Sequence, residues 1–278
     1  MSDNFSKGSG DSDKSPYALS RSEKKGIAGF LETLLRKFKT LMQLTLIIPL
    51  YGVASVILGI SIVPGVIIVR EAHLFSASYS PLISAFIIGA ALVASFFACG
   101  FTAMIVLPII NKLFVGKLKQ WKGPYYSLEA IRWYIHNGIL YLLRYSFLEF
   151  VTPSPFGLWF YTAMGMKVGR NSVINSTHIS DPSLIQIGHR VTIGGSATIV
   201  AHYGQAGFLV LSPVLIEDDV TIGLRATVMG GVKIRKGAKI LPNSVVMPKT
   251  EVPAGEIWGG VPAHKLDLKK MVSPEHSE

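Results

Sequence analysis

The sequence predicts an α-helical membrane hairpin followed by an all-β domain in the form of a parallel β-helix. Three observations lead to this fold class. The first half contains two long apolar stretches without charge, and the second half repeats its apolar residues with a period of six. Only 16% of the 278 residues are charged, whereas 49% are hydrophobic. A soluble domain usually carries about 25% charged residues, so the composition alone favours a membrane part.

The N-terminal segment changes from polar to amphipathic near residue 26. Residues 1–26 are rich in Ser, Asp, Lys and Gly, and such a segment buries too little surface to offset its ordering entropy. We therefore expect a disordered tail there, and no apolar core of a signal peptide follows within it. In residues 27–40 the apolar side chains recur at helical spacing, which predicts an amphipathic helix leading into the bilayer.

Residues 41–111 contain the two apolar stretches. No charged residue stands between Lys39 and Arg70, and none stands between Glu71 and Lys112. A helix needs about 20 apolar residues to cross the hydrocarbon core, and both stretches exceed that length. They predict two transmembrane helices. Small residues four apart in the second stretch are expected to pack the hairpin, since they let helix backbones approach closely; they are Ala90, Ala94 and Ala98, and Ala91, Ser95 and Cys99.

The net charge of +10 is concentrated at the two ends of this membrane part. Basic residues flanking membrane helices tend to lie in the cytoplasm, so both ends are predicted to be cytoplasmic. Nucleic-acid binding is not predicted, because no basic stripe with interleaved aromatic residues lies outside these flanks. The flanking residues are Lys7, Lys14, Arg21, Lys24, Lys25, Arg36, Lys37 and Lys39 before the first stretch, and Lys112, Lys117, Lys119 and Lys122 after the second.

Residues 112–165 are predicted to form an interfacial helical segment. The aromatic and apolar stretch 126–150 is interrupted by Arg132 and Arg144, and the 11 residues between them are too few to span a bilayer. We expect a helix that lies on the membrane, with four aromatic side chains at headgroup depth: Trp133, Tyr134, Tyr141 and Tyr145.

Residues 166–266 carry the period of six. Seven of the eight consecutive hexads begin with Ile or Val, and six have a small or β-branched fifth residue. This pattern predicts three hexads per coil, with the first residue of each pointing inward and Gly223 supplying a turn conformation. The eight hexads begin at Ile216, Ile222, Val228, Ile234, Ile240, Val246, Val252 and Trp258. Earlier hexads begin at Val168, Ile174, Ile187, Ile193 and Ile199, with a one-residue insertion within residues 180–186.

The repeat is interrupted by residues 205–215, which we expect to be extruded from the β-helix as a loop. His202 lies at the edge of this loop. Its ordinary pKa is near neutrality, so a histidine there is suited to act as a general base for an acceptor hydroxyl or amine. The alternative is a surface histidine beside a loop.

The hexads, the loop with its histidine and the terminal sequence Trp258-Gly-Gly-Val-Pro-Ala resemble the hexapeptide-repeat acyltransferases, whose fold is a left-handed β-helix. Residues 100–266 more closely resemble the membrane-embedded C-terminal repeats of poly-lysine-synthetase-type non-ribosomal peptide synthetases. The resemblance implies a homotrimer with the site between neighbouring coils, and it implies His202 as the catalytic base. It also implies that the pantetheine arm of the donor binds Trp258, Gly259, Gly260, Pro262 and Ala263.

No carboxylate follows His202 in the loop, in contrast to family members with an acid next to the histidine, so we expect a backbone carbonyl to orient its ring. Two further histidines, His178 and His189, are predicted to be turn residues. They suggest a second possibility, a metal site as in γ-type carbonic anhydrases. Those enzymes use a close pair of histidines within one chain, and the sequence near His202 has no such pair, so no metal is predicted.

The sequence therefore predicts a multi-pass protein of the bacterial inner membrane, with a C-terminal tail at residues 267–278. Its expected activity is the transfer of an acyl group, most simply acetyl, from CoA or a pantetheinyl carrier. The acceptor would be a hydroxyl or amine of a lipid-linked or polymeric saccharide or a peptide. No bound cofactor is expected, because acyl-CoA is a substrate. The alternative is a non-catalytic trimeric scaffold or synthetase-docking protein, which an open cleft beside Gly259 and Gly260 would argue against.

Overall fold

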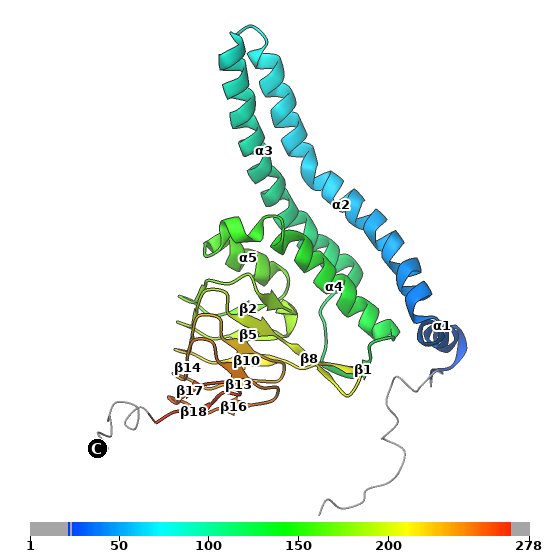
Figure 1. Ribbon diagram of the computed structural model, residues 1–278, viewed down its shortest axis with the longest axis vertical. Coiled ribbons are helices and arrows are strands. Elements are labelled where there is room, and N and C mark those ends of the chain that lie inside the picture. The colour runs from blue at the N-terminus through cyan, green and yellow to red at the C-terminus, as the bar shows by residue number, and fades with distance from the viewer. Residues whose placement is uncertain (1–21, 23, 268–278) are drawn as a thin grey trace, which may run out of the picture.

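The computed structural model describes residue 22 and residues 24–267. The predicted tails 1–26 and 267–278 lie almost wholly outside this range. The described chain has three parts: a long helical hairpin, a layer of shorter helices, and a β-helix whose first coil adjoins that layer (Figure 1). The predicted order of helical and β parts is confirmed.

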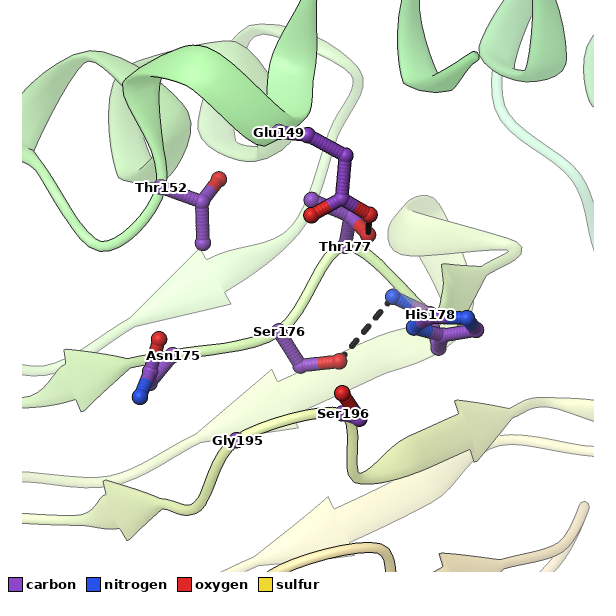
Figure 2. A pocket seen from close by; sticks show the side chains of 8 residues that line it. All are labelled: Glu149, Thr152, Asn175, Ser176, Thr177, His178, Gly195 and Ser196. Carbon is purple, nitrogen blue, oxygen red and sulfur yellow. Dashed lines mark hydrogen bonds between the residues drawn. The ribbon is translucent and has the colours of Figure 1, made fainter.

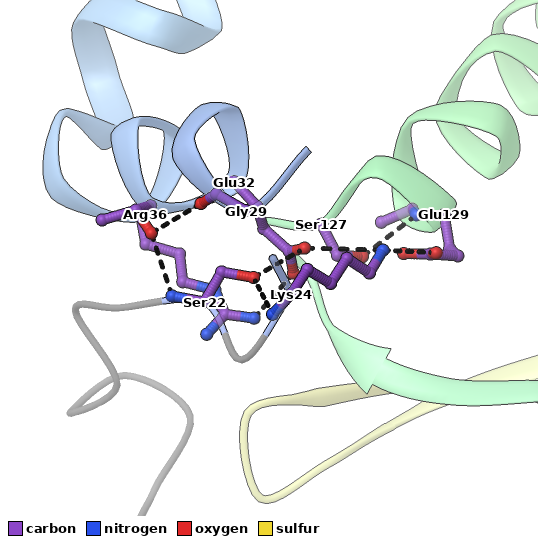
Figure 3. Close-up of polar contacts among 9 residues, drawn as sticks. Ser22, Lys24, Gly29, Glu32, Arg36, Ser127 and Glu129 are labelled. Atoms are coloured by element: carbon purple, nitrogen blue, oxygen red, sulfur yellow. Dashed lines mark hydrogen bonds and ion pairs between the residues drawn. The ribbon is translucent and has the colours of Figure 1, made fainter. Parts of the chain in front are cut away.

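Helix α1 (Gly26–Lys37) corresponds to the predicted amphipathic helix. It is joined to the start of helix α4 (Leu128–Arg144) by a polar cluster shown in Figure 3. The Lys24 ammonium lies 2.5 Å from the Glu129 carboxylate, and Glu32, only 2% exposed, pairs with Arg36 at 2.7 Å. The Lys24–Glu129 pair links the segment that precedes the hairpin to the helical layer, and the Glu32–Arg36 pair lies within α1.

Helices α2 (Lys39–Ser76) and α3 (Pro81–Ile110) form the hairpin, and a π-helical turn, η1 (Asn111–Val115), ends it. Two stretches are long and apolar enough to cross a membrane, Tyr51–Ser76 and Pro81–Val115. Gly65 of α2 faces Ser95 and Cys99 so closely that a Cβ at Gly65 would collide with both side chains. The predicted packing of the hairpin is thus confirmed for the set that includes Ser95 and Cys99.

Helix α4 begins where Ser127 Oγ accepts a hydrogen bond from the Ala130 amide, and its buried face includes Leu140 and Leu143. Tyr134, Tyr141 and Tyr145 are exposed, as the interfacial prediction requires. Trp133 is the exception, since it is half-buried and faces the β-helix, so its predicted place at headgroup depth is wrong. The helical layer is completed by η2 (Leu148–Val151) and α5 (Pro155–Ala163).

The β-helix consists of three parallel sheets, each receiving one short strand from each of the first four coils, and a fifth coil adds a strand to the first and second sheets. The first sheet contains β2 (Lys167–Val168), β5 (Ile185–Ile187), β10 (Val214–Ile216), β13 (Lys233–Ile234) and β16 (Glu251–Val252). The second contains β3 (Val173–Ile174), β6 (Thr192–Ile193), β11 (Thr221–Ile222), β14 (Lys239–Ile240) and β17 (Ile257–Gly259), with β18 (His264–Lys265) antiparallel at its edge. The third contains β4 (Ile179–Ser180), β7 (Thr198–Val200), β12 (Thr227–Val228) and β15 (Val245–Val246).

The register confirms three hexads per coil. Ile216 pairs with Ile234, and Ile234 pairs with Val252, so that the first residues of hexads stack above one another. From Ile216 to Val252 all seven of these residues are at most 2% exposed, which makes them the core of the domain. Burial of such branched apolar side chains stabilises the fold by about 1.5–3 kcal/mol each.

The corners of the β-helix are made differently from the prediction for Gly223. The left-handed turn conformation falls two residues later, on Arg225 with a φ of 55°. A Cβ at Gly223 would instead lie 2.5 Å from the backbone nitrogen of Pro242 in the next coil. Glycine is therefore required at this position because successive coils approach too closely for a side chain.

The first coil departs from the hexad count. Ile179 pairs with Ile199, so Ile179 is an inward-facing position although it follows Ile174 by five residues rather than six. The surplus residues between Ile179 and Ile187 form a 3-10 turn, η3 (Pro182–Leu184), which Asp181 precedes in a left-handed conformation with a φ of 60°. The predicted insertion is thus present, and it places an aspartate at a corner.

The predicted extrusion from the β-helix is confirmed, but it is an ordered hairpin that begins at His202. Strands β8 (His202–Gln205) and β9 (Phe208–Leu211) pair antiparallel, and β9 also pairs with β1 (Trp121–Pro124). Strand β1 follows η1 in the chain. The β-hairpin that begins with His202 is therefore attached directly to the segment that leaves the long helical hairpin.

Candidate active site

His202 and Asp181 form a hydrogen-bonded pair at the corner between the third and first sheets. His202 stands at the start of β8 in the second coil, and Asp181 occupies the same corner in the first coil. The distance from His202 Nδ1 to Asp181 Oδ2 is 2.5 Å. Asp181 is fully buried, while 22% of the His202 side chain is exposed. The expectation that a backbone carbonyl orients His202 is wrong, because a carboxylate from the preceding coil does so.

The second oxygen of Asp181 is bound by helix α4. Trp133 Nε1 donates to Asp181 Oδ1 at 2.8 Å, and Asn137 Nδ2 donates to the same oxygen at 3.1 Å. Burial alone would raise the pKa of Asp181, but the hydrogen bonds from His202 and Asn137 and the nearby charge of His202 outweigh burial and lower it. Asp181 is consequently a buried carboxylate held in its ionised form.

This arrangement determines which nitrogen of His202 is available for chemistry. A carboxylate can only accept, so Nδ1 carries the proton and Nε2 is left with a free lone pair. The indole ring of Trp133 meets the imidazole edge-on, with the ring centroids 5.0 Å apart. Nε2 of a partly exposed, oriented imidazole is suited to take a proton from a hydroxyl or amine.

Helix α4 also carries a buried histidine next to Asn137. His136 is fully buried, and its Nδ1 donates to Asn111 Oδ1, 2.8 Å away at the end of α3. Burial lowers the pKa of His136 to about 4, so the ring is neutral. The contact fixes α4 against the last turn of the hairpin.

His189 and His178 both lie at corners, as predicted. His189 Nδ1 accepts a hydrogen bond from the Arg170 amide at 2.9 Å, which gives it a structural role in its turn. His178 lines a polar cavity of about 260 Å³ between the helical layer and the first two coils (Figure 2). Burial and the nearby Arg144 lower its pKa.

The polar character of this cavity comes from Glu149 and from hydroxyl and amide side chains. Glu149 accepts a hydrogen bond from Thr177 Oγ1, and the His178 amide donates to Ser176 Oγ at 3.0 Å. Among the described residues, Nδ1 of His178 has no hydrogen-bond partner. The cavity lies at the corner between the second and third sheets, not at the corner of His202.

The predicted donor-binding residues lie on the fifth coil. Trp258 and Gly259 belong to β17, and Gly260, Pro262 and Ala263 form the following turn. Coils are about 4.8 Å apart, so these residues lie about 14 Å along the axis from the coil of His202. They also lie at a different corner. One chain therefore does not bring them together with His202.

The local structure explains why residues 259 and 260 are both glycine. A Cβ at Gly259 would lie 2.7 Å from Leu266, which folds back over β17, and Gly260 has a φ of +96°. Trp258 Nε1 donates to Glu256 at 2.8 Å. The segment 260–262 is exposed, so it is accessible to a ligand.

Sequence reasoning missed Asp181, Trp133 and Asn137. Asp181 is the only acidic residue in the stretch where the hexad count slips, and this slip was its one visible signal. Trp133 and Asn137 stand four residues apart on a helix, which places them on one face. Nothing in the sequence pattern indicates that this face meets a corner of the β-helix.

The histidines raised the possibility of a metal site in the β-helix. In the part of the chain that the structure describes, no group of three or more His, Cys, Asp or Glu side chains is arranged to hold a metal ion. Asp181 and His202 form a pair, and Asp181 is occupied by its two donors from α4.

This chain is similar to a known family model and to several known proteins. A family model described as the hexapeptide repeat of succinyl-transferase matches residues 213–248. Delta-poly-L-ornithine synthetase of Acinetobacter baumannii (strain AB307-0294) is 28% identical over 162 residues, which are 56% of this chain and 12% of that protein. Gamma carbonic anhydrase 1 of Arabidopsis thaliana, a mitochondrial protein, is 32% identical over 126 residues, covering 42% of this chain and 43% of its own length.

A shorter relative matches over most of its length. The protein YvoF of Bacillus subtilis (strain 168), which is named as an acetyltransferase, is 31% identical over 148 residues, covering 50% of this chain and 85% of YvoF. By contrast, the chain spans less than half the length of the synthetase and of the carbonic anhydrase. Together with the hexad register and the matching family model, the similarity to YvoF shows that this chain belongs to the hexapeptide-repeat acyltransferase family.

Proposed function

We propose that this protein is a membrane-anchored acyltransferase in which His202 is the catalytic base and Asp181 orients it. The observation that carries the proposal is the 2.5 Å contact between His202 Nδ1 and Asp181 Oδ2. A histidine that is oriented by a buried carboxylate and remains partly exposed is the arrangement that general-base catalysis needs. Because the chain belongs to the acyltransferase family, the reaction that we assign to this base is acyl transfer.

The reaction proceeds by direct transfer. His202 Nε2 takes the proton from the acceptor hydroxyl or amine as its oxygen or nitrogen attacks the carbonyl carbon of the acyl thioester. When the resulting tetrahedral intermediate collapses, the carbon–sulfur bond breaks and the thiolate leaves. The imidazolium returns its proton to the thiolate, so that free thiol and acylated acceptor are the products. Asp181 stabilises the imidazolium during this cycle.

The donor is acetyl-CoA or another pantetheine thioester, bound along residues 258–263. Trp258, Gly259, Gly260, Pro262 and Ala263 would line the pantetheine arm. Because His202 lies about three coils away at another corner of the same chain, we place each site between two chains of a homotrimer. One chain then contributes the base and its neighbour contributes the donor-binding segment.

The hairpin α2–α3 would anchor the protein in the membrane. Within an apolar stretch of 18 residues in each segment, 17% and 6% of the residues are buried in the chain, so most of both apolar surfaces is uncovered. A soluble protein rarely exposes apolar patches larger than a few hundred Å². With basic residues at both ends of the hairpin, the β-helix would face the cytoplasm of a bacterial inner membrane, where acyl-CoA is present.

The acceptor would be a membrane-proximal saccharide or peptide with a free hydroxyl or amine. The helical layer lies between the hairpin and the first coil (Figure 1). His202 stands at the start of β8, in the second coil. This position suits an acceptor that is held at the bilayer by a lipid or by a long polymer. It does not require the acceptor to leave the membrane surface.

Turnover and binding of CoA together test this proposal. Detergent-solubilised protein is offered acetyl-CoA with a panel of sugar and amine acceptors, and release of free CoA is followed with a thiol reagent. Acceptor-dependent release supports the transferase. No release with any acceptor, combined with no binding of CoA by calorimetry, would support a non-catalytic trimeric scaffold or synthetase-docking protein instead.

A further inference from the structure

We propose that Trp133 and Asn137 of helix α4 are positioning residues for the active site, which hold Asp181 so that it keeps His202 in the catalytic tautomer. This inference rests on the proposed function, since it explains how the base of that reaction is prepared. It assigns the helical layer next to the hairpin a part in catalysis beyond anchoring.

The hydrogen bonds around Asp181 divide between its two oxygens. Oδ2 receives the Nδ1 proton of His202 at 2.5 Å, and Oδ1 receives two N–H groups from α4 at 2.8 and 3.1 Å. Rotation of the carboxylate would break all three bonds. The donors on Oδ1 therefore fix the plane of the carboxylate, and with it the direction in which Oδ2 meets His202.

The two donors are themselves held by α4. Trp133 and Asn137 are four residues apart and lie on one helical face, and Asn137 Nδ2 also donates to the Trp133 carbonyl at 3.1 Å. The helix is capped by Ser127 and attached to the end of α3 through His136 and Asn111. Neither donor therefore depends on a flexible loop for its position.

A purely structural role would not need these groups. The same buried face of α4 carries Ala130, Leu140 and Leu143, which pack without polar partners. A buried carboxylate costs several kcal/mol in desolvation unless donors surround it, and an apolar residue of similar size would stabilise the contact at least as well. Trp133 and Asn137 place two N–H donors where α4 meets Asp181, the partner of His202.

The contact between Trp133 and His202 adds a second constraint. The two rings meet at 73°, with 5.0 Å between their centroids. The indole thus limits rotation of the imidazole while its N–H binds the carboxylate. Trp133→Phe separates the two effects, because it keeps a ring beside His202 and removes only the N–H donor.

The test reads the tautomer of His202 directly. Protein labelled with ¹⁵N-histidine is studied by NMR in detergent micelles, and the His202 signals are assigned by their loss in His202→Gln. Wild type is expected to carry its proton on Nδ1. Trp133→Phe and Asn137→Leu, which is similar in size but has no donor, are each expected to lower the share of this tautomer, and the double variant is expected to lower it further.

Matched variants control for folding of the helix. Tyr141→Phe lies on the exposed face of α4 and should leave the tautomer unchanged. Asn137→Gln retains a carboxamide donor and should restore part of the Nδ1–H signal that Asn137→Leu loses. If the double variant does not fold, Trp133→Phe alone carries the test.

Kinetics supply an independent readout. Trp133→Phe and Asn137→Leu are each expected to lower kcat for acetyl transfer about tenfold and to leave KM for acetyl-CoA unchanged. This result would fit loss of positioning rather than loss of donor binding. An unchanged tautomer in Trp133→Phe and in the double variant would overturn the inference. The tautomer can be measured without turnover, so a chain that shows the expected tautomer change but transfers no acyl group would disprove the proposed function alone.

Discussion

Ile179 pairs with Ile199 in the third sheet, and the next residue that opens a hexad, Ile187, follows Ile179 by eight positions rather than six. The surplus residues cannot remain in the strands, so they form the turn that begins at Asp181. Because Ile199 is followed at the same corner by His202, the slip in the repeat brings Asp181 beside this histidine. An irregularity of the first coil thus completes a site whose other half lies in the second.

The pairing makes a prediction for Asp181→Asn. The α4 donors would still bind the carboxamide oxygen, so the amide nitrogen would face His202 and favour the tautomer without a proton on Nδ1. We expect kcat to fall by about 10²–10⁴, with little change in KM for acetyl-CoA. Steady-state kinetics of wild type and of Asp181→Asn measures kcat and KM.

Asp219→Asn is the matched control for that variant. Asp219 also has a left-handed conformation at a corner, but it pairs with Arg190 on the surface at 2.6 Å. Its substitution should leave kcat within about twofold of wild type, because exposed ion pairs contribute little. Equal loss of activity in the two variants would mean that Asp181 acts through stability alone.

The sequence predicted the β-helix well because the hexad pattern is a direct record of burial. Each residue that opens a hexad from Ile216 to Val252 faces the core, and the period leaves no other register. Asp181 could not be predicted in the same way, since its role depends on its lying at the same corner of the β-helix as His202 in the next coil. The sequence predicts a one-residue insertion within residues 180–186, whereas the structure has a step of five residues from Ile174 to Ile179 and a step of eight to Ile187.

Trp133 shows a different limit of sequence reasoning. Aromatic residues on an amphipathic helix near a membrane are expected at headgroup depth, and Tyr134, Tyr141 and Tyr145 are indeed exposed. Trp133 is aromatic like these tyrosines, but it lies on another face of α4 and packs against the β-helix. The packing of α4 on the first coil decides which of its faces is covered, and helical periodicity does not encode that packing.

His136 gives a prediction about stability and pH. The pKa of His136 is about 4 in the folded protein and 6.5 ordinarily. Between these two pH values the unfolded chain binds a proton at His136 and the folded protein does not. Folding should therefore become less favourable as the pH falls from about 6.5 to about 4, by a total of about 3 kcal/mol from this residue. Above pH 6.5 the residue should contribute no pH dependence.

The variant His136→Gln isolates this contribution. Glutamine stays neutral over the whole range, so the difference in free energy of unfolding between the two proteins should change with pH only between about 4 and 6.5. Thermal unfolding in detergent at several pH values measures it. A constant difference across that range would show that His136 is not the neutral, buried group described above.

Mixed trimers test whether each site lies between two chains. His202→Ala chains and Trp258→Ala chains should each be inactive alone. If one chain supplies His202 and its neighbour supplies Trp258, random mixing in equal amounts leaves about a quarter of the sites intact. Co-expression should then restore about a quarter of wild-type activity. Activity at the level of the separate variants would place both residues of each site in one chain.

The membrane anchor and its orientation can be tested with cysteine labelling. Cys99 is the only cysteine of the chain, so Cys99→Ser gives a background for new ones. A membrane-impermeant maleimide added to intact spheroplasts should label Ala77→Cys, in the turn between α2 and α3. Lys236→Cys on the β-helix should be labelled only after lysis. Equal labelling of both before lysis would contradict the proposed topology.

The most direct test of the central claim compares kcat/KM for acceptor-dependent CoA release by wild type and by His202→Ala. His189→Ala serves as the control, since His189 is a turn residue away from the site. If His202 is the catalytic base, the substitution should lower kcat/KM by about 10²–10⁴ and His189→Ala should not. A His202→Ala protein that releases CoA at the wild-type rate would contradict the proposed mechanism and require another base.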